Sequence, residues 1–219
     1  MSGGRGRSRA LLWSGIALVV AGPAVLGYIS WQLYGTTWVA KREQDRIVRE
    51  TEQAWESGQG SASGRASDVA ALIRIPAFGD EYVVPAHVGT DDDTLARGFG
   101  IFEDAAEPGA VGNFALSGHR ITHGEPLRGM PDLEAGDEVV VETRSTTYTY
   151  ELVTDGDALT VDLDAGWVVE PDPTDPRTGE RVSTVADSRR LITLVTCAEL
   201  FHTDDRLVAF GRLVSEDPR

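Results

Sequence analysis

The sequence predicts an all-β domain that follows one N-terminal membrane-spanning helix. Two observations support this fold class. Residues 10–40 contain no Asp, Glu, Lys, Arg or His, and about 20 apolar residues are enough to cross the hydrocarbon core of a bilayer. After residue 68, short segments rich in Val, Thr and Tyr alternate with Gly and Pro. Many short strands at close spacing are typical of a β-sandwich or a closed β-barrel.

The apolar segment 11–34 predicts a transmembrane signal anchor. The alternative is a cleaved signal peptide, which has an apolar core of about 7–15 residues. The run here is longer, and its ends are rich in Trp and Tyr, as at membrane interfaces. Residues 1–10 contain three arginines and no acid, so the positive-inside rule predicts a cytoplasmic tail. In this single-pass arrangement the remainder of the chain is extracellular.

Residues 35–67 are expected to connect the anchor to the folded domain. Lys41–Glu56 is polar and rich in helix-forming residues, and it predicts a juxtamembrane helical stalk. Ser57–Ser67 is rich in Gly and Ser, which is typical of a flexible linker. The folded domain is expected over residues 68–219, an ordinary size for one domain.

Within the domain, the sequence predicts strands, one short helix and one long loop. The helix is Asp91–Arg97 with Asp91 as its N-cap, and Gly98-Phe99-Gly100 predicts a turn. Glu170–Arg181 is expected to be a surface loop, because its prolines lack the N–H that a central strand needs. The predicted strands are Val69–Ile75, Tyr82–Val84, Asn113–Ser117, Glu138–Thr143, Thr147–Val153, Ala158–Val161, Trp167–Glu170, Leu191–Cys197 and Arg206–Val214.

The charge balance and the cysteine content exclude several classes of partner and site. The chain has 20 Lys and Arg against 35 Asp and Glu, for a formal net charge of −15. Because nucleic-acid binding needs a basic face for the phosphates, we expect no nucleic acid as a partner. Cys197 is the single cysteine, so an intramolecular disulfide is impossible. A lone thiol outside the cell is either a reactive group or a small buried hydrophobe.

The position of Cys197 favours a reactive thiol. Leu191–Cys197 is apolar on both faces, as in a buried strand, and the cysteine lies at its end, where side chains leave the core. Arg206 opens another apolar strand. If these two strands pair, the thiol and the guanidinium lie near the same rim. A neighbouring cation favours the thiolate, which is the nucleophilic form.

A cysteine nucleophile also needs a proton partner, most often a histidine. His119 follows a strand end, and His202 lies in the turn after the cysteine, whereas His87 and His123 are expected in loops. The residues alone leave His119 and His202 as alternatives. His119 and His123 have metal-ligand spacing only in a helix, and glycines bracket the pair. We therefore expect no metal and no cofactor.

At these positions the sequence resembles the sortase family. The matching segments are Ser117-Gly118-His119-Arg120 and Thr193-Leu194-Val195-Thr196-Cys197, followed by Arg206 at the start of the next strand. Gly118–Thr143 is most similar to class E sortases of actinobacteria, and the resemblance covers about Val69–Val214.

The resemblance implies an eight-stranded β-barrel with short helices and the activity of a cysteine transpeptidase. Cys197 would attack the Thr–Gly bond of a C-terminal sorting signal of the LAxTG or LPxTG type and form a thioester. His119 would be the general acid, and Arg206 would hold the substrate and stabilise the oxyanion. The further residues expected to contact the substrate are Thr196, Ser117 and Thr122. His123 stands where the family often has Tyr, and Ala198-Glu199 departs from the residues that frequently follow the cysteine.

The implied partners are surface proteins with a sorting signal, an amine of the lipid II stem peptide and, through the N-terminal helix, the membrane. Three alternatives stay open. An L,D-transpeptidase-like acyltransferase expects Ser-x-Gly-Cys, but this chain has Thr-Leu-Val-Thr-Cys. A pilin-polymerising sortase usually has an N-terminal lid with an Asp-Pro-aromatic anchor, which residues 57–68 do not contain. A non-catalytic surface binding domain needs no accessible thiol.

Overall fold

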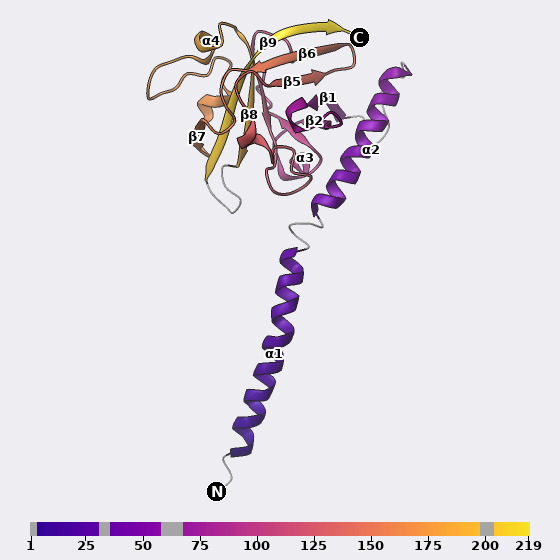
Figure 1. Cartoon of the computed structure of the whole chain (residues 1–219), viewed down its shortest axis with the longest axis vertical. Helices are drawn as coiled ribbons and strands as arrows, with labels where there is room; N and C mark the ends of the chain where they lie inside the picture. Colours follow the sequence, from indigo (N-terminus) through magenta and orange to yellow (C-terminus); the bar gives the residue numbers. More distant parts are fainter. Residues whose placement is uncertain (1–3, 31–35, 58–67, 198–203) are drawn as a thin grey trace.

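The computed structural model describes residues 4–30, 36–57, 68–197 and 204–219 (Figure 1). The predicted linker beyond Ser57, the Ala198-Glu199 departure and the candidate His202 lie outside these described residues.

Two helices precede the domain. α1 covers Gly4–Ser30, with Pro23 inside it, and α2 covers Thr36–Glu56. Among the residues that the structure describes, no helix is both long and apolar enough to cross a bilayer. The structure thus confirms a helix over most of the predicted anchor 11–34, but it does not confirm a membrane span.

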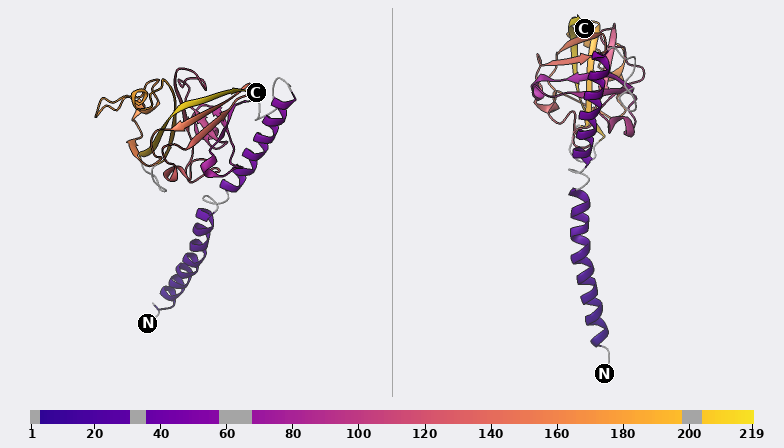
Figure 2. Two further views of the ribbon diagram at one scale, coloured as in Figure 1. Left: turned by 45° about the horizontal axis from the view of Figure 1, so that its top comes forward. Right: turned by 90° about the vertical axis from the view of Figure 1, so that its right-hand side faces the viewer.

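α2 is a helix, as predicted for Lys41–Glu56, and one of its faces is buried. It lies along one side of the domain in Figure 1, and the view from that side in Figure 2 shows it in front of the strands. Its buried side chains recur every three or four residues, which places them on one helical face, and they pack toward β2 (Val84–Val88). These side chains are only 0–7% exposed: Ala40, Gln44, Ile47, Val48 and Thr51. The prediction missed this face because two of its five residues are polar and the rest of the helix is strongly charged.

Over the described residues the domain is a nine-stranded sheet in the order β6-β5-β1-β2-β3-β4-β8-β9-β7. An additional pairing of β6 with β9 closes eight of these strands into a barrel, which confirms the expected barrel. β7 lies outside the ring and pairs with the part of β9 that β6 does not reach. The strands are β1 (Val69–Arg74), β2 (Val84–Val88), β3 (Phe99–Ile101), β4 (Gly112–Ser117), β5 (Glu138–Glu142), β6 (Thr146–Leu152), β7 (Leu159–Asp162), β8 (Arg190–Cys197) and β9 (Asp205–Pro218).

Short helical turns occupy several connections between the strands. The predicted helix is α3 (Asp92–Leu95), which is shorter than expected. Its N-cap is confirmed, since the Asp91 carboxylate accepts hydrogen bonds from Thr94 N at 3.1 Å and Thr94 Oγ1 at 2.7 Å. The other short helices are η3 (Pro76–Phe78), η4 (Met130–Asp132), η5 (Gly166–Val169) and α4 (Val182–Val185).

Three predicted elements are wrong. Gly98-Phe99-Gly100 is not a turn, because Phe99–Ile101 forms the buried strand β3. At Gly100 a Cβ would lie 2.4 Å from Gly89 O, so glycine there permits close approach of two backbones. Trp167–Glu170 is not a strand, since residues 166–169 form η5.

The third wrong prediction is the strand Tyr82–Val84, which overlaps β2 only at Val84, because Pro85 lies inside β2 rather than ending a strand. β3 joins β2 only from Ala86 onward, so at Pro85 the strand still has an open edge, where a missing N–H is tolerated. As a result, His87 belongs to β2 and not to a loop as predicted, and its side chain is only 1% exposed.

β8 is buried on both faces, as its sequence predicts. Ile192 and Leu194 belong to the cluster that fills the barrel. Leu191 and Val195, which point to the opposite face, belong to a second cluster with residues of η5, α4 and β9. The segment after β7 therefore covers the outside of β8 and forms a wall next to the end of that strand.

Candidate active site

β8 and β9 place Cys197 next to Arg206. The strands pair antiparallel, and Cys197 is the direct partner of Arg206 in the register. Side chains of directly opposed residues project from the same face of a sheet, so the strand pairing on which the prediction depended is confirmed, and both residues line one cavity. Both side chains are half-buried, and Arg206 Nη1 also donates a hydrogen bond to Asp205 O at 3.0 Å.

β4 brings His119 to the same edge of the barrel. β4 runs parallel to β8, with Ser117 opposite Val195, so both strands end at the same edge. The hydroxyl of Thr196 donates a hydrogen bond to Gly118 O at 2.7 Å, and Gly118 N donates to Val195 O at 3.1 Å. These two bonds fix the chain directly before His119 to the chain directly before Cys197.

The three residues line a common cavity of about 380 Å³. One wall is largely apolar and comes from β7 and η5, while β4, β8, β9 and α3 supply the polar groups. Ser117 and Thr196 also line the cavity, whereas Thr122 is not among its described lining residues. The other lining residues are Thr90, Asp92, Leu95, Phe102, Gly118, Val161, Asp162, Leu163, Ala165, Gly166, Val168, Val169 and Val195. Substrate contacts of Ser117, Thr196 and Thr122 stay predictions.

The environment of His119 favours its neutral form. Burial lowers the pKa of His119 because it disfavours the imidazolium, and the neighbouring His123 lowers it further, while the carboxylate of Asp92 acts in the opposite direction. The rings of His119 and His123 lie 5.0 Å apart at an angle of 32°. Near neutral pH the imidazole is thus mostly unprotonated and able to accept a proton.

His123 and Asp92 lie close enough to His119 to affect its pKa, and the sequence did not predict this placement. The four-residue spacing of the two histidines was a signal, but it was considered only for metal binding. In the part of the chain that the structure describes, no three His, Cys, Asp or Glu side chains form a cluster suited to a metal ion. Asp92 was expected only in the first turn of a helix.

Asn113 is a buried residue that connects three parts of the site. Its amide Nδ2 donates hydrogen bonds to Val168 O at 3.2 Å and Glu170 O at 3.1 Å, and its Oδ1 accepts one from Thr193 Oγ1 at 2.7 Å. β4 is therefore joined to the η5 wall and to β8 at once. The sequence predicted Asn113 as part of a strand, and its polar side chain in a buried strand was a signal for buried hydrogen-bond partners.

Comparison with known proteins links most of the barrel to one family. The model of the sortase domain matches residues 73–214. Sortase SrtE1 of Streptomyces coelicolor is 32% identical over 213 residues, which cover 94% of this chain and 57% of that protein. Sortase SrtE2 of the same organism is 27% identical over 236 residues, covering 97% and 88%. The crystal structure of sortase E1 from S. coelicolor with a tripeptide in the active site is similar with a TM-score of 0.57 at 31% identity, covering 69% of this chain and 91% of that one.

Proposed function

The chain belongs to the sortase family, a family of cysteine transpeptidases, and on that premise we propose that it is a class E sortase. Its substrates are surface proteins that carry a C-terminal sorting signal of the LAxTG or LPxTG type. The main support is that three separate strands bring His119, Cys197 and Arg206 to a common cavity. The sortase match also sets aside the L,D-transpeptidase alternative.

In the first step, Cys197 Sγ attacks the carbonyl carbon of the Thr–Gly bond. The thiol proton passes to His119, and the guanidinium of Arg206 stabilises the oxyanion of the tetrahedral intermediate. His119 then donates its proton to the Gly nitrogen, the C–N bond breaks, and a thioester on Cys197 remains. The lowered pKa of His119 makes its imidazolium a strong acid toward the leaving nitrogen.

In the second step, an amine of the lipid II stem peptide attacks the thioester. The neutral imidazole of His119 accepts the proton that the amine loses, and the thiolate of Cys197 leaves. The surface protein is thereby joined to the cell-wall precursor through a new amide bond. The neutral form required for this step is the one that the burial of His119 favours.

The catalytic domain is proposed to lie outside the cell, attached by a single-pass anchor over residues 11–34 with residues 1–10 in the cytoplasm. The absence of charged residues over 10–40 and the three arginines before them support this topology. The membrane is then a partner of the N-terminal helix, and nucleic acid is not a partner.

The proposed activity is tested with the full chain and two peptides, one with LAxTG and one with LPxTG, in the presence of an added amine. We expect cleavage after Thr, a peptide adduct on Cys197 in the intact-mass spectrum, and a product joined to the amine. Cys197→Ala must form no adduct. If the wild-type chain gives neither adduct nor cleaved peptide, the transpeptidase is rejected in favour of a non-catalytic binding domain.

A further inference from the structure

α2 contacts the chain that follows His119, far from the helix in sequence. We call residues 119–127 the histidine loop, because Leu127 N donates a hydrogen bond back to His119 O at 3.0 Å and closes the segment. Gln44 of α2 is 4% exposed, and its Nε2 donates a hydrogen bond to His123 O at 3.0 Å. A side chain of the juxtamembrane helix therefore holds the backbone of this loop.

The loop has a conformation that needs external support. Three consecutive residues have positive φ angles: 52° at His123, 89° at Gly124 and 55° at Glu125. Only glycine adopts this region without a steric penalty. Strained residues of this kind persist where surrounding contacts fix them, and the bond from Gln44 reaches the first of the three.

The side chain of Gln44 packs directly against the backbone of Gly124. A Cβ on Gly124 would lie 2.5 Å from Gln44 Oε1. The loop is fixed on another side by Tyr82, whose hydroxyl donates a hydrogen bond to Pro126 O at 2.6 Å. Since the His123 ring packs 5.0 Å from the His119 ring, a shift at residues 123–125 changes the surroundings of His119 directly.

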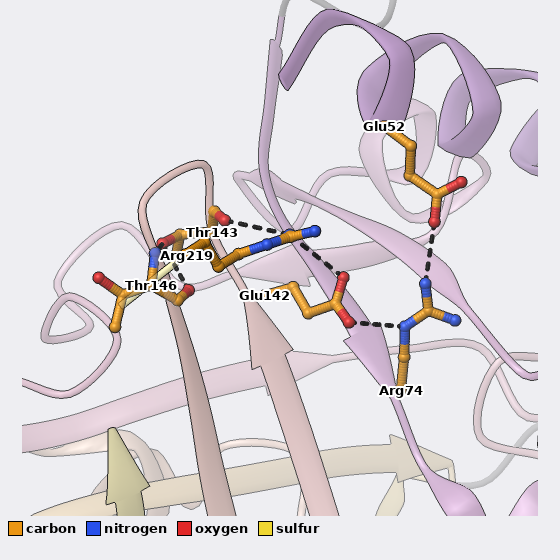
Figure 3. A network of polar contacts seen from close by, with 6 residues as sticks. All are labelled: Glu52, Arg74, Glu142, Thr143, Thr146 and Arg219. Carbon is orange, nitrogen blue, oxygen red and sulfur yellow. Dashed lines mark hydrogen bonds and ion pairs between the residues drawn. The ribbon is translucent and has the colours of Figure 1, made fainter. Parts of the chain in front are cut away.

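α2 is also held at a site remote from Gln44. Glu52 accepts a hydrogen bond from Arg74 Nη2 at 2.9 Å, and Arg74 Nε donates to Glu142 Oε1 at 2.8 Å (Figure 3). Arg219 Nη1 lies 3.4 Å from the other oxygen of Glu142. Because this network and the buried apolar face hold the helix, removal of the Gln44 amide is a local change that leaves α2 docked.

We propose that Gln44 is a positioning residue for His119. By fixing the left-handed segment 123–125, it keeps the imidazole where it can donate a proton to the leaving nitrogen. The inference rests on the proposed function, and it makes the helix between anchor and barrel part of the catalytic unit rather than a spacer.

The test compares Gln44→Ala and Gln44→Met in the full chain with Gln53→Ala as the control. Gln53 lies on the same helix but is exposed, and Met fills the space of Gln without donating a hydrogen bond. We expect both Gln44 variants to lower kcat for an amide peptide by about 10- to 100-fold, because misplacement of a reacting group by about 1 Å can cost that much. KM should change little, and Gln53→Ala should behave as the wild type.

A second substrate separates a loss of His119 positioning from a general loss of activity through a disturbed fold. In an ester analogue of the Thr–Gly bond, the leaving oxygen depends less on protonation than an amide nitrogen does. We expect the Gln44 variants to slow thioester formation, measured in a single turnover without added amine, clearly less on the ester than on the amide. Equal losses on both substrates, or unchanged kcat on the amide, would overturn the inference.

Hydrogen exchange of the Leu127 amide gives a readout that does not depend on turnover. We expect faster exchange in the Gln44 variants than in Gln53→Ala, because the loop opens more often. Unchanged exchange would show that Gln44 does not hold the loop.

The failure of the proposed function and the failure of this inference give different results. If the wild-type chain cleaves no peptide, the proposed function is rejected. If the wild type is active and the Gln44 variants are equally active, only the positioning role is rejected.

Discussion

Arg206 lies directly opposite Cys197, which is compatible with two roles that Arg206→Lys separates. If Arg206 only favoured the thiolate, lysine would nearly suffice, because a positive charge remains. If it holds the oxyanion, lysine should fail, since it lacks the planar fork of donors. We expect transpeptidation to fall about 100- to 1000-fold, with iodoacetamide labelling of Cys197 close to normal. Near-normal transpeptidation would reject the oxyanion role, and slow labelling with slow turnover would indicate thiol activation instead.

His123 should control the protonation of His119. In His123→Asn, the repulsion from a second imidazole is lost, and Asn tolerates the positive φ of 52° at this position. The pKa of His119 should therefore rise toward its ordinary value, although burial still opposes this. Because both proposed steps begin with neutral His119, the pH below which turnover falls should shift upward in His123→Asn, and turnover near pH 7.5 should not increase.

An NMR titration of the His119 ring protons measures this change directly, and the rate at pH 7.5 is read on the same sample. His87→Asn is a suitable control, because His87 lies in β2 and does not line the cavity. A His119 pKa that stays constant or falls in His123→Asn would contradict the predicted repulsion.

The residues that sequence analysis could identify are those with a local signal. Cys197 ends an apolar run and Arg206 begins the next one, so a single assumption of strand pairing brought them together. The choice of His119 over His202 came only from the family resemblance. Gln44 could not be found, because its partner His123 is 79 residues away and a polar residue in a charged helix looks solvated.

At the scale of elements, Asn113 should stabilise the wall formed by η5. Asn113→Leu leaves Thr193 Oγ1 and the carbonyls of Val168 and Glu170 without this partner. Buried polar groups that lose their partner cost about 1–3 kcal/mol each, so we expect the free energy of unfolding to fall by about 3 kcal/mol. Urea denaturation measures this loss.

Thr193→Val provides the matched comparison for Asn113→Leu. It removes only the bond between Thr193 and the Asn113 oxygen, so its loss should be about 1 kcal/mol. The peptide KM should rise in Asn113→Leu more than in Thr193→Val, because Val168 lines the cavity. Equal effects of the two substitutions would mean that the bonds to the η5 segment contribute nothing.

Elements with clear periodicity or a cap were predictable, whereas those defined by tertiary contacts were not. The β5–β6 hairpin and the Asp91 cap follow from local sequence. The strand β3 contains two residues of a Gly-x-Gly segment, and only its neighbours on both sides make it a strand. η5 is rich in Val and Trp, which favoured a strand, but it packs as a helical turn over β8.

At the scale of the whole molecule, local sequence left a sandwich and a barrel as alternatives. The closure between β6 and β9 and the parallel pairing of β4 with β8 join segments far apart in the chain. The periodicity within one segment does not encode such pairings, so the eight-stranded barrel could be predicted only from the resemblance to the sortase family. The docking of α2 onto this barrel likewise joins distant parts of the sequence, since Gln44 donates a hydrogen bond to His123 O.

The final prediction concerns the topology of the full chain, which its single cysteine makes easy to measure. With the three arginines of residues 1–10 in the cytoplasm, Cys197 must lie outside the cell. A small charged methanethiosulfonate that cannot cross membranes should therefore label Cys197 in intact cells. Cys197→Ala should stay unlabelled, and a second cysteine introduced as Ser2→Cys into Cys197→Ala should react only after permeabilisation. Labelling of Cys197 only in permeabilised cells would place the domain inside and reject the topology.

The mass of the labelled protein decides between an anchor and a signal peptide, because an uncleaved anchor retains residues 1–34 and a cleaved signal peptide does not.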